Sequence, residues 1–423
     1  MATRVRRRVM TAGVLAMAGV LVIGGCAGTR AAPGHRASAG AWGDAESARE
    51  VDLSDAAVAA AIDAGAALLV KMREGEGEWP YEGVYRVGGR IPIGYRVGGT
   101  AIVVQALALA PGYEASAARQ DSVARGLAFI CGAQGEALMS PEDYTGGYDV
   151  RTWGYIEAIG CLATLRTKGL IPEGQREACD AALAWYCRAL HAMEIPRAGG
   201  WNYARGPREN PSAPSPFMTA RALQALFEAR AAGQHVDAGV VARALGVLEK
   251  ARTPSGSVVY SGAGEGRRAR QADATPGAVG RIASSESTLL LAGRGGLRDT
   301  RAAVDAFLTH WQWLEDRRSK PGTHEGPYAV APYYFMFAHY YAAQCVERLP
   351  AEERVEYRRR VRERLFAVRD EEGGWNDRVF GRSRAYGTAM AMLALMQPEM
   401  APATWEPPAV EAGGAEAPGA EGR

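Results

Sequence analysis

Two stretches near the C-terminus, Gly373-Gly374-Trp375-Asn376 and Thr388-Ala-Met-Ala-Met-Leu-Ala-Leu395, carry the pattern that decides the fold of this chain. The pattern is a glycine-aromatic turn followed by a segment of the form Thr-Ala-x4-Ala-Leu. It recurs twice upstream, at Gly199-Gly200-Trp201-Asn202 with Thr219–Leu226 and at Glu78-Trp79 with Thr100–Leu107. Three copies of one pattern indicate an internally repeated fold.

Each turn is preceded by a stretch with the spacing of an amphipathic helix. In residues 56–71, Val58, Ile62 and Leu69 recur at helical spacing behind Ser54, a residue type favoured at helix N-caps. The Thr-Ala segments are instead small and apolar on nearly every side, which is typical of a helix enclosed by others. The repeating unit is therefore a helical hairpin: an outer helix, a structured loop and an inner helix.

Three weaker copies fill the intervals between the strong ones. They pair residues 122–131 with 153–165, 238–251 with 282–292, and 297–314 with 331–346, around the turn aromatics Tyr148, Tyr260 and Tyr328. Successive turn aromatics lie 47 to 69 residues apart, which is too long for tetratricopeptide or ankyrin repeats. We therefore predict one all-α domain over residues 54–397. Its architecture is an (α/α)6 toroid of six helical hairpins, with inner and outer rings of helices.

These turns and the helices after them resemble the prenyltransferase/squalene-oxidase repeat of the terpenoid-cyclase and protein-prenyltransferase toroids. The resemblance covers residues 54–397 and implies the toroid fold. It leaves the activity open, because that superfamily includes cyclases, prenyltransferase subunits and proteins of unknown role.

The sequence departs from the catalytic motifs of that superfamily. Class II triterpene cyclases protonate their substrate with an Asp-x-Asp-Asp acid, whereas residues 271–275 offer Asp273 as their one carboxylate. The Asp-x-Cys of the zinc-binding prenyltransferase subunits does not occur in the sequence. These departures disfavour both activities, and we expect no metal and no cofactor.

The N-terminus has the pattern of an export signal. An arginine-rich start and an apolar run over residues 9–23 lead into Gly24-Gly25-Cys26, which resembles the lipobox of bacterial lipoproteins. We expect residues 1–25 to be a signal peptide, Cys26 to be lipidated, and residues 26–53 to be a flexible tether. The protein would then be anchored in the cell envelope on its periplasmic side. An ordinary secreted protein is the alternative.

Composition bounds the remaining possibilities. The formal net charge is +2, and the arginines are scattered rather than gathered in runs interleaved with aromatics, so we expect no nucleic-acid partner. The five cysteines after Cys26 lie in apolar helical patterns and are expected to be buried core residues, without a disulfide framework. Residues 398–423 are rich in Pro, Gly, Ala and Glu, and we expect them to form a disordered tail.

Ring closure would bring the starts of all six inner helices, and the loops before them, to one rim. Those loops carry Arg86, Arg90, Arg96, Arg151, Arg205, Arg208, Arg281, Arg378, Arg382 and Arg384, and the acids Asp149, Glu209, Asp273, Glu286, Glu325 and Asp377. Helix N-termini favour anions, so we expect a small molecule or glycan at this rim, with an anionic or sugar-acid ligand as the hypothesis. The alternative is that the arginines are surface charges or pair with loop acids such as Asp149 and Glu209.

One loop stands out as a candidate site. Residues 322–328 place His324, Glu325 and Tyr328 in a non-helical segment, where core packing does not explain them, whereas His339 downstream is expected to be a satisfied core group. The candidate ligand-binding residues are therefore His324, Glu325, Tyr328, Arg151, Arg281, Arg384, Asp149 and Glu286.

Two classes of function remain open from the sequence. We favour an envelope-tethered binding or scaffold protein. The alternative is an enzyme on the same fold, either of the polysaccharide lyase or glycosidase kind or a terpene-cyclase-like one. Two carboxylates about 5 to 9 Å apart would favour a glycosidase.

Overall fold

The computed structural model describes residues 51–75, 77–142, 144, 146–263 and 270–406. All of them belong to the second of two compact units in the chain, Glu50–Arg423. The predicted signal peptide, Cys26 and most of the tether lie outside the described residues, as does the tail beyond Glu406. Within the described part, no helix is long and apolar enough to cross a membrane.

The described residues form twelve α-helices in alternating outer and inner positions. The inner helices are α2 (Ile93–Leu109), α4 (Arg151–Thr167), α6 (Pro216–Ala231), α8 (Thr275–Leu291), α10 (Tyr334–Val346) and α12 (Ser383–Leu395). The outer helices are α1 (Asp55–Lys71), α3 (Ala117–Gly132), α5 (Arg176–Ala192), α7 (Ala238–Ala251), α9 (Leu297–Glu315) and α11 (Ala351–Phe366). Short 3-10 turns occupy Tyr113–Ala115, Ala133–Gly135, Ala137–Met139, Glu173–Gln175, Gln271–Asp273 and Gln397–Glu399.

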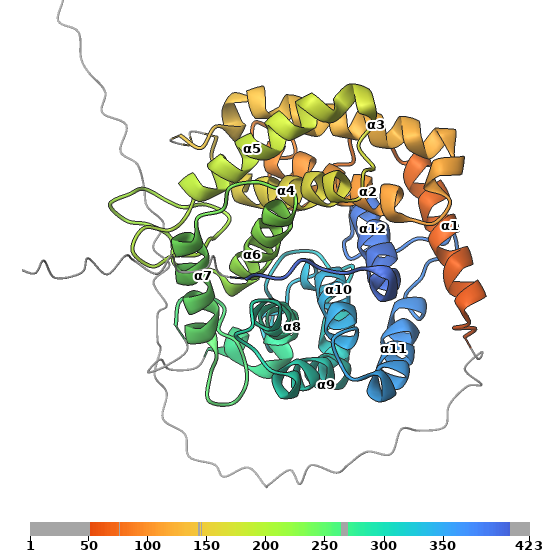
Figure 1. Cartoon of the computed structure of the whole chain (residues 1–423). Helices are drawn as coiled ribbons and strands as arrows, with labels where there is room; N and C mark the ends of the chain where they lie inside the picture. Colours follow the sequence, from red (N-terminus) through yellow and green to blue (C-terminus); the bar gives the residue numbers. More distant parts are fainter. Residues whose placement is uncertain (1–50, 76, 143, 145, 264–269, 407–423) are drawn as a thin grey trace, which may run out of the picture. The chain divides into compact units, whose positions relative to one another are not determined.

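The inner helices close into a ring. Each packs against the inner helix before and after it, and α12 packs against α2 to complete the circle (Figure 1). Nearly every residue of an inner helix is buried, as in α10, whereas α11 on the outside buries only Val361 and Leu365. The predicted (α/α)6 toroid of six hairpins is confirmed, including the assignment of the inner and outer rings.

The repeated sequence pattern has a physical explanation in the turns. The indole N–H groups of Trp79, Trp201 and Trp375 each donate to a leucine carbonyl near the end of the preceding outer helix, at 2.8 Å. The backbone N–H groups of the same tryptophans donate to the threonine hydroxyls of Thr100, Thr219 and Thr388. The tryptophan indole thus bonds the turn to the outer helix, and the threonine hydroxyl bonds the same turn to the inner helix.

The three weaker repeats use their aromatic residue differently. Trp79, Trp201 and Trp375 are buried, whereas Tyr148, Tyr260 and Tyr328 are only half-buried and pack against other aromatic rings. In the strong repeats the turn aromatic is therefore part of the core, whereas in the weak repeats it is a tyrosine that lies nearer the surface.

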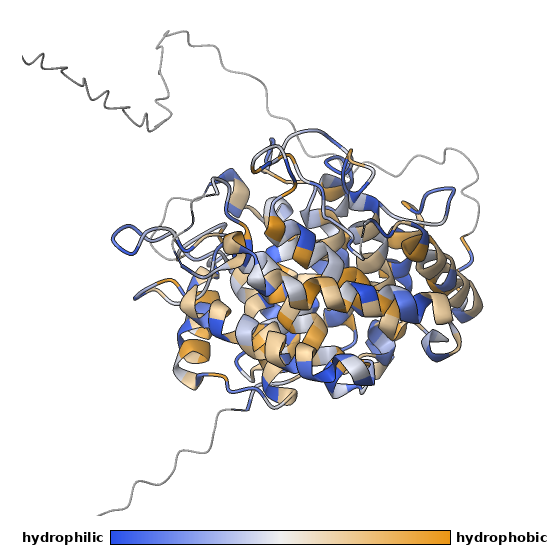
Figure 2. Ribbon diagram, turned by 90° about the horizontal axis from the view of Figure 1, so that it is seen from above, coloured by the Kyte–Doolittle hydropathy of each residue, from blue (hydrophilic) through white to orange (hydrophobic). Residues whose placement is uncertain are grey.

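The two ends of the toroid differ. The loops leading into the inner helices are long, for example from Met72 to Pro92, whereas the return connections are short, as between Leu291 and Leu297. Figure 2 shows polar loops gathered on one side of the helices. This is the rim at which the inner helices begin.

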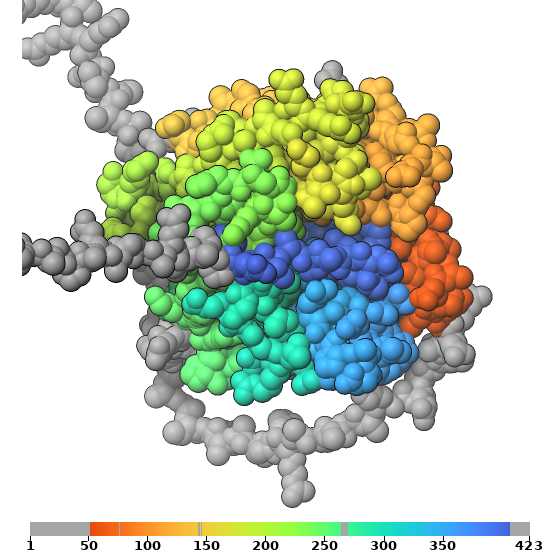
Figure 3. Space-filling view, viewed as in Figure 1, coloured from red at the N-terminus to blue at the C-terminus, as the bar shows by residue number. Residues whose placement is uncertain are grey.

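The opposite end is covered by the C-terminal segment, which crosses it as a blue band in Figure 3. Trp405 stacks on Phe227 with ring centroids 5.7 Å apart, lies under the guanidinium of Arg230, and donates its backbone N–H to Leu291. The domain therefore continues beyond the boundary expected at residue 397, at least to Glu406. The five cysteines of the described part are buried and free, as expected.

Candidate active site

Two groups of aromatic side chains lie at the rim where the inner helices begin. In the first group, Tyr81 packs against Tyr95, Trp153 and Tyr386 with ring centroids 4.5 to 5.7 Å apart. Tyr148 adjoins the same group through Tyr95. These residues come from the first, second and sixth repeats, so ring closure brings them together.

The second group comes from the third, fourth and fifth repeats. The ring centroid of Phe217 lies 4.3 Å from that of Phe337 and 5.4 Å from that of Tyr334. The ring of Tyr203 also packs against Phe217. Burial raises the pKa of Tyr203 most, and the phenols of Tyr95 and Tyr148 in the first group raise it further. We call the whole cluster the aromatic mouth: Tyr81, Tyr95, Tyr148, Trp153, Tyr203, Phe217, Tyr260, Tyr333, Tyr334, Phe337 and Tyr386.

Asp377 is the buried acid of the aromatic mouth. Its side chain has no solvent exposure, Oδ1 has no hydrogen-bond partner, and Oδ2 accepts a hydrogen bond from the Tyr81 hydroxyl at 3.4 Å. Burial raises the pKa of this carboxyl to about 7, against the smaller opposing effects of Arg378 and Tyr81. A carboxyl with such a pKa can give or take a proton at neutral pH.

Arg378, the next residue in the chain, is a buried cation. It is 3% exposed, and its guanidinium lies 5.7 Å from the centre of the Tyr81 ring. Its Nε has no hydrogen-bond partner, and its guanidinium makes no ion pair within the described part of the chain. Its backbone N–H donates to the side chain of Asn376, which fixes the turn after Trp375. Asp377 and Arg378 thus carry unused hydrogen-bonding capacity in a buried place.

His324 lies at the outer edge of the aromatic mouth. Its Nδ1 lies 2.9 Å from the carbonyl of Ala329, and its Nε2 lies 3.1 Å from the Tyr260 hydroxyl and 3.0 Å from that of Tyr333. Burial lowers the pKa of His324, which favours the neutral ring. A neutral ring that donates from Nδ1 has one lone pair at Nε2, which the hydroxyls of Tyr260 and Tyr333 share.

Below the aromatic mouth, the interior of the toroid is filled. Arg221 pairs with Glu157 at 3.1 Å and with Glu228 at 3.0 Å, and all three side chains are largely buried. Burial raises the pKa of both glutamates. The remaining cavity among these groups is about 20 Å³, roughly the space of one water molecule. The interior therefore has no room for a sugar-sized ligand.

The residues predicted from the sequence are dispersed. Asp149 pairs with Arg151 at 2.9 Å, Glu286 with Arg252, Glu325 with Arg317 at 3.0 Å, and Arg384 with Asp370 at 2.6 Å and with Glu372. Tyr328 packs edge-on against Trp313. Arg281 contacts the mouth through the rings of Tyr260 and Tyr334, but its N–H groups donate to Val258, Ala272 and Tyr334. Of the eight, His324 and Arg281 lie at the aromatic mouth.

The three arginines among the candidate binding residues, Arg151, Arg281 and Arg384, thus have partners. For Arg151 the partner is Asp149, as the alternative interpretation held. Asp377 and Arg378 were included only as loop acid and loop arginine, with nothing to set them apart. The signal in the sequence was their place directly after the third strong turn. Glu157, Arg221 and Trp153 lie inside apolar helical patterns and gave no signal of a site.

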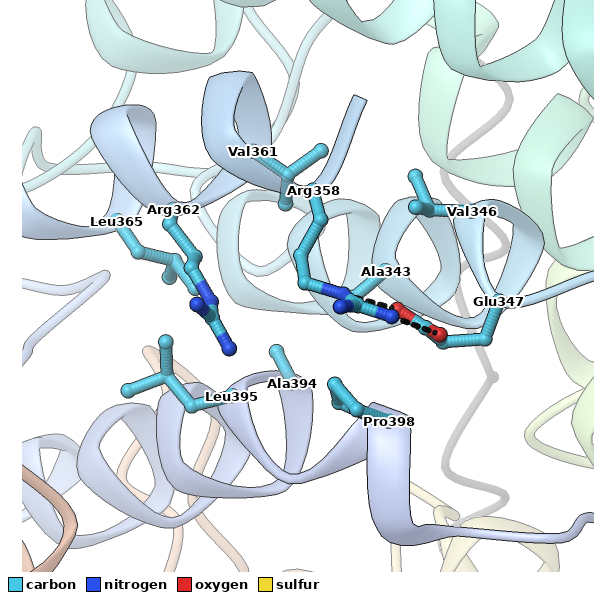
Figure 4. Close-up of a pocket in the computed structure, with 10 residues that line it drawn as sticks. All are labelled: Ala343, Val346, Glu347, Arg358, Val361, Arg362, Leu365, Ala394, Leu395 and Pro398. Carbon is cyan, nitrogen blue, oxygen red and sulfur yellow. Dashed lines mark hydrogen bonds and ion pairs between the residues drawn. The ribbon is translucent and has the colours of Figure 1, made fainter. Parts of the chain in front are cut away.

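Other hollows lie away from Asp377. Asp149 and Arg151 line a surface pocket of about 480 Å³, together with Arg205, Arg208 and Glu209. At the opposite end, a crevice of about 10 Å³ lies between α10, α11 and α12, where Arg358 pairs with Glu347 at 2.7 Å (Figure 4). No group of three or more histidine, cysteine, aspartate or glutamate side chains suited to a metal ion occurs among the described residues.

Comparisons with known proteins add the class of fold. No protein-family model matches the sequence, and no curated protein is significantly similar to it. Solved structures do match. One is an inactive variant of the α-1,6-mannanase of Salegentibacter sp. in complex with α-1,6-mannotetrose, at 12% identity and a TM-score of 0.52, covering 80% of this chain and 99% of that one.

Two further matches have similar values. A D-mannose isomerase aligns at 12% identity and a TM-score of 0.51, covering 82% of this chain and 98% of that one. A cellobiose 2-epimerase from Bacillus thermoamylovorans aligns at 11% identity and a TM-score of 0.51, covering 82% and 100%. The chain therefore has the α/α-toroid fold that these three proteins share.

Proposed function

We propose that this protein is a carbohydrate-active enzyme in which Asp377 transfers a proton to or from a sugar held in the aromatic mouth. The observation that carries the proposal is Asp377 itself. It is fully buried, one of its oxygens lacks a hydrogen bond, and its pKa is about 7. A protein gains no stability from such a group, so its presence is best explained by chemistry.

A sugar is the ligand class that suits the surroundings of Asp377. Aromatic rings offer flat apolar faces, and the phenols of Tyr81, Tyr95 and Tyr386 add hydrogen-bonding groups beside them. The names of the similar structures agree with this choice, since they are a mannanase, a mannose isomerase and a cellobiose epimerase.

Proton transfer suits this mouth better than hydrolysis. Glycoside hydrolysis requires two available carboxyl groups a short distance apart. The other acids near the mouth are engaged with arginines: Asp149 with Arg151, Glu157 with Arg221, and Glu325 with Arg317. A single titrating carboxyl is sufficient for proton abstraction beside a carbonyl, as in isomerisation, epimerisation or elimination.

The binding or scaffold function favoured by the sequence is the second candidate. Nothing in a purely binding site requires a buried carboxyl that titrates near neutrality. A terpene-cyclase-like reaction suits the mouth less well, because protonating an alkene needs a stronger acid than one with a pKa of about 7.

Solvent exchange provides a test that works even when the product is unidentified. The purified protein would be incubated in D₂O with free sugars and oligosaccharides, and deuterium at carbon would be followed by NMR. We expect exchange with at least one sugar, reduced about 100-fold or more by Asp377→Asn. Asp316→Asn, an exposed acid at the end of α9, is the matched control and should keep full activity. Unchanged exchange in Asp377→Asn would refute the role of Asp377.

We further propose that the protein acts outside the cytoplasm as a lipoprotein anchored through Cys26. This rests on the resemblance of residues 23–26 to a lipobox. Cys26→Ala should move the protein from the membrane fraction to the soluble fraction. Membrane association of that variant would contradict the anchor.

A further inference from the structure

We propose that Arg378 is the receptor for a carboxylate group, so that the sugar bound in the aromatic mouth is an acidic one, a hexuronate. This inference rests on the proposed function and narrows its substrate class. It names Arg378 as a specificity-determining residue.

The first observation is the missing partner of a buried charge. A guanidinium taken out of water is costly unless acceptors surround it. The other buried arginines of the described chain have such acceptors. Arg151 has Asp149, Arg221 has two glutamates, and Arg281 has two carbonyls and a phenol. Arg378 is as buried as these, but its Nε has no hydrogen-bond partner and its guanidinium forms no ion pair with a described residue.

The adjacent acid does not supply the missing partner. Asp377 follows Asn376 in the same turn, yet no nitrogen of Arg378 forms an ion pair with it in the described structure, and Oδ1 of Asp377 is itself unsatisfied. With a pKa of about 7, this carboxyl is also protonated in a large fraction of molecules at neutral pH. Arg378 therefore keeps its positive charge free for an anion that arrives with the ligand.

The position of Arg378 puts that anion where the sugar would lie. The guanidinium lies against the ring of Tyr81, which contacts Tyr95, Trp153 and Tyr386. Burial lowers the pKa of His324 at the outer edge of the mouth, and the charges of Arg281, Arg317 and Arg378 lower it further. A pyranose ring on these aromatic side chains would have its carboxylate within reach of Arg378.

A carboxylate suits this place better than a phosphate or a sulfate. Arginine binds carboxylates through two parallel hydrogen bonds. A single guanidinium balances one negative charge, whereas a phosphate monoester brings nearly two and would lie next to the carboxyl of Asp377. The other arginines around the mouth, such as Arg151 and Arg281, have no capacity left to share a second charge.

Calorimetric titration of the full chain with matched sugars tests the inference. The probes are tetragalacturonate and tetraglucuronate, with cellotetraose as the neutral sugar and inorganic phosphate and sulfate as the other anions. We expect at least one uronate to bind 10-fold or more tightly than cellotetraose, and the inorganic anions to compete weakly. Arg378→Gln should remove this preference, and Arg378→Lys should restore part of it.

Arg382→Gln provides the control for a general loss of positive charge, because Arg382 lies on the same loop and pairs with Glu74 at the surface. It should leave uronate binding unchanged. Equal binding of neutral and acidic sugars, or an unchanged preference in Arg378→Gln, would overturn the inference. Stronger binding of phosphate or sulfate than of either uronate would overturn the choice of a carboxylate. Thermal melting of each variant shows whether it is folded.

The inference and the proposed function fail in different ways. Uronate-selective binding without deuterium exchange would refute the enzyme and leave the carboxylate site standing. Exchange on neutral sugars, with no preference for uronates, would refute the carboxylate site and leave the enzyme standing.

Discussion

The hydroxyl of Tyr81 donates a hydrogen bond to Oδ2 of Asp377, a residue 296 positions later in the chain. Tyr81 follows the turn of the first repeat and Asp377 follows the turn of the sixth, so this bond spans the junction at which the ring closes. The contact is buried and its length is 3.4 Å, which leaves the carboxyl only weakly stabilised as an anion. Closure of the toroid thus brings Asp377 next to the Tyr81 hydroxyl, which lowers the pKa of Asp377.

Tyr81→Phe should shift the pH dependence of the reaction upward. The Tyr81 hydroxyl lowers the pKa of Asp377, so its removal leaves burial less opposed and raises that pKa further above 7. The limb of the pH–rate profile that reports Asp377 should therefore move to higher pH, with the ring stacking preserved. Tyr85→Phe, an exposed tyrosine on the same loop, is the control. A limb that moves to lower pH, or that does not move, would show that the Tyr81 hydroxyl does not lower the pKa of Asp377.

Asp377→Asn should stabilise the protein, and more so at higher pH. The carboxyl ionises at 3.8 in the unfolded chain and near 7 in the native fold. Between these values only the native state holds the proton, so wild-type stability falls as pH rises from about 4 to about 7 and then levels off. The full cost is on the order of 4 kcal/mol. Melting temperatures of variant and wild type should agree near pH 4 and diverge by pH 8.

The fold follows from the sequence because its signals are local. The tryptophan turns and the threonines after them are bonded to each other, as Trp375 is to Thr388, so sequence proximity and spatial contact coincide. His339 likewise behaves as expected. It lies 2.9 Å from the indole Nε1 of Trp311 and 2.8 Å from the carbonyl of Phe335, and burial lowers its pKa to about 4.

The site does not follow from the sequence because it depends on contacts between distant repeats. Exposed loop arginines and buried ones look alike in a sequence. Arg384 forms an ion pair with Asp370, fourteen residues earlier. The Nε of Arg378, six residues before Arg384, has no hydrogen-bond partner among the residues that the structure describes. That difference depends on what lies across the ring, where Tyr81 rather than an acid faces Arg378.

Thr388→Val should weaken the closing repeat without altering its shape. The threonine hydroxyl accepts the backbone N–H of Trp375 at 3.1 Å, and valine leaves that buried donor unsatisfied. A loss of about 1–2 kcal/mol in the free energy of unfolding is expected. Thr167→Val, at the exposed end of α4, should cost far less. Urea denaturation of the two variants measures the difference, and equal losses would show that the bond to Trp375 contributes little.

The last prediction concerns the segment that covers the end opposite the aromatic mouth. Trp405 is 7% exposed, stacks on Phe227 and lies 4.4 Å under the guanidinium of Arg230. Trp405→Ala removes these contacts from the ends of the inner helices, and we expect it to lower the free energy of unfolding by about 3 kcal/mol. Trp405→Phe should recover most of the loss, since the stacking ring is retained. Because Asp377 lies at the other rim, uronate binding and deuterium exchange should persist in the folded fraction of both variants. Full stability in Trp405→Ala would show that the domain ends near residue 397, as its composition suggests.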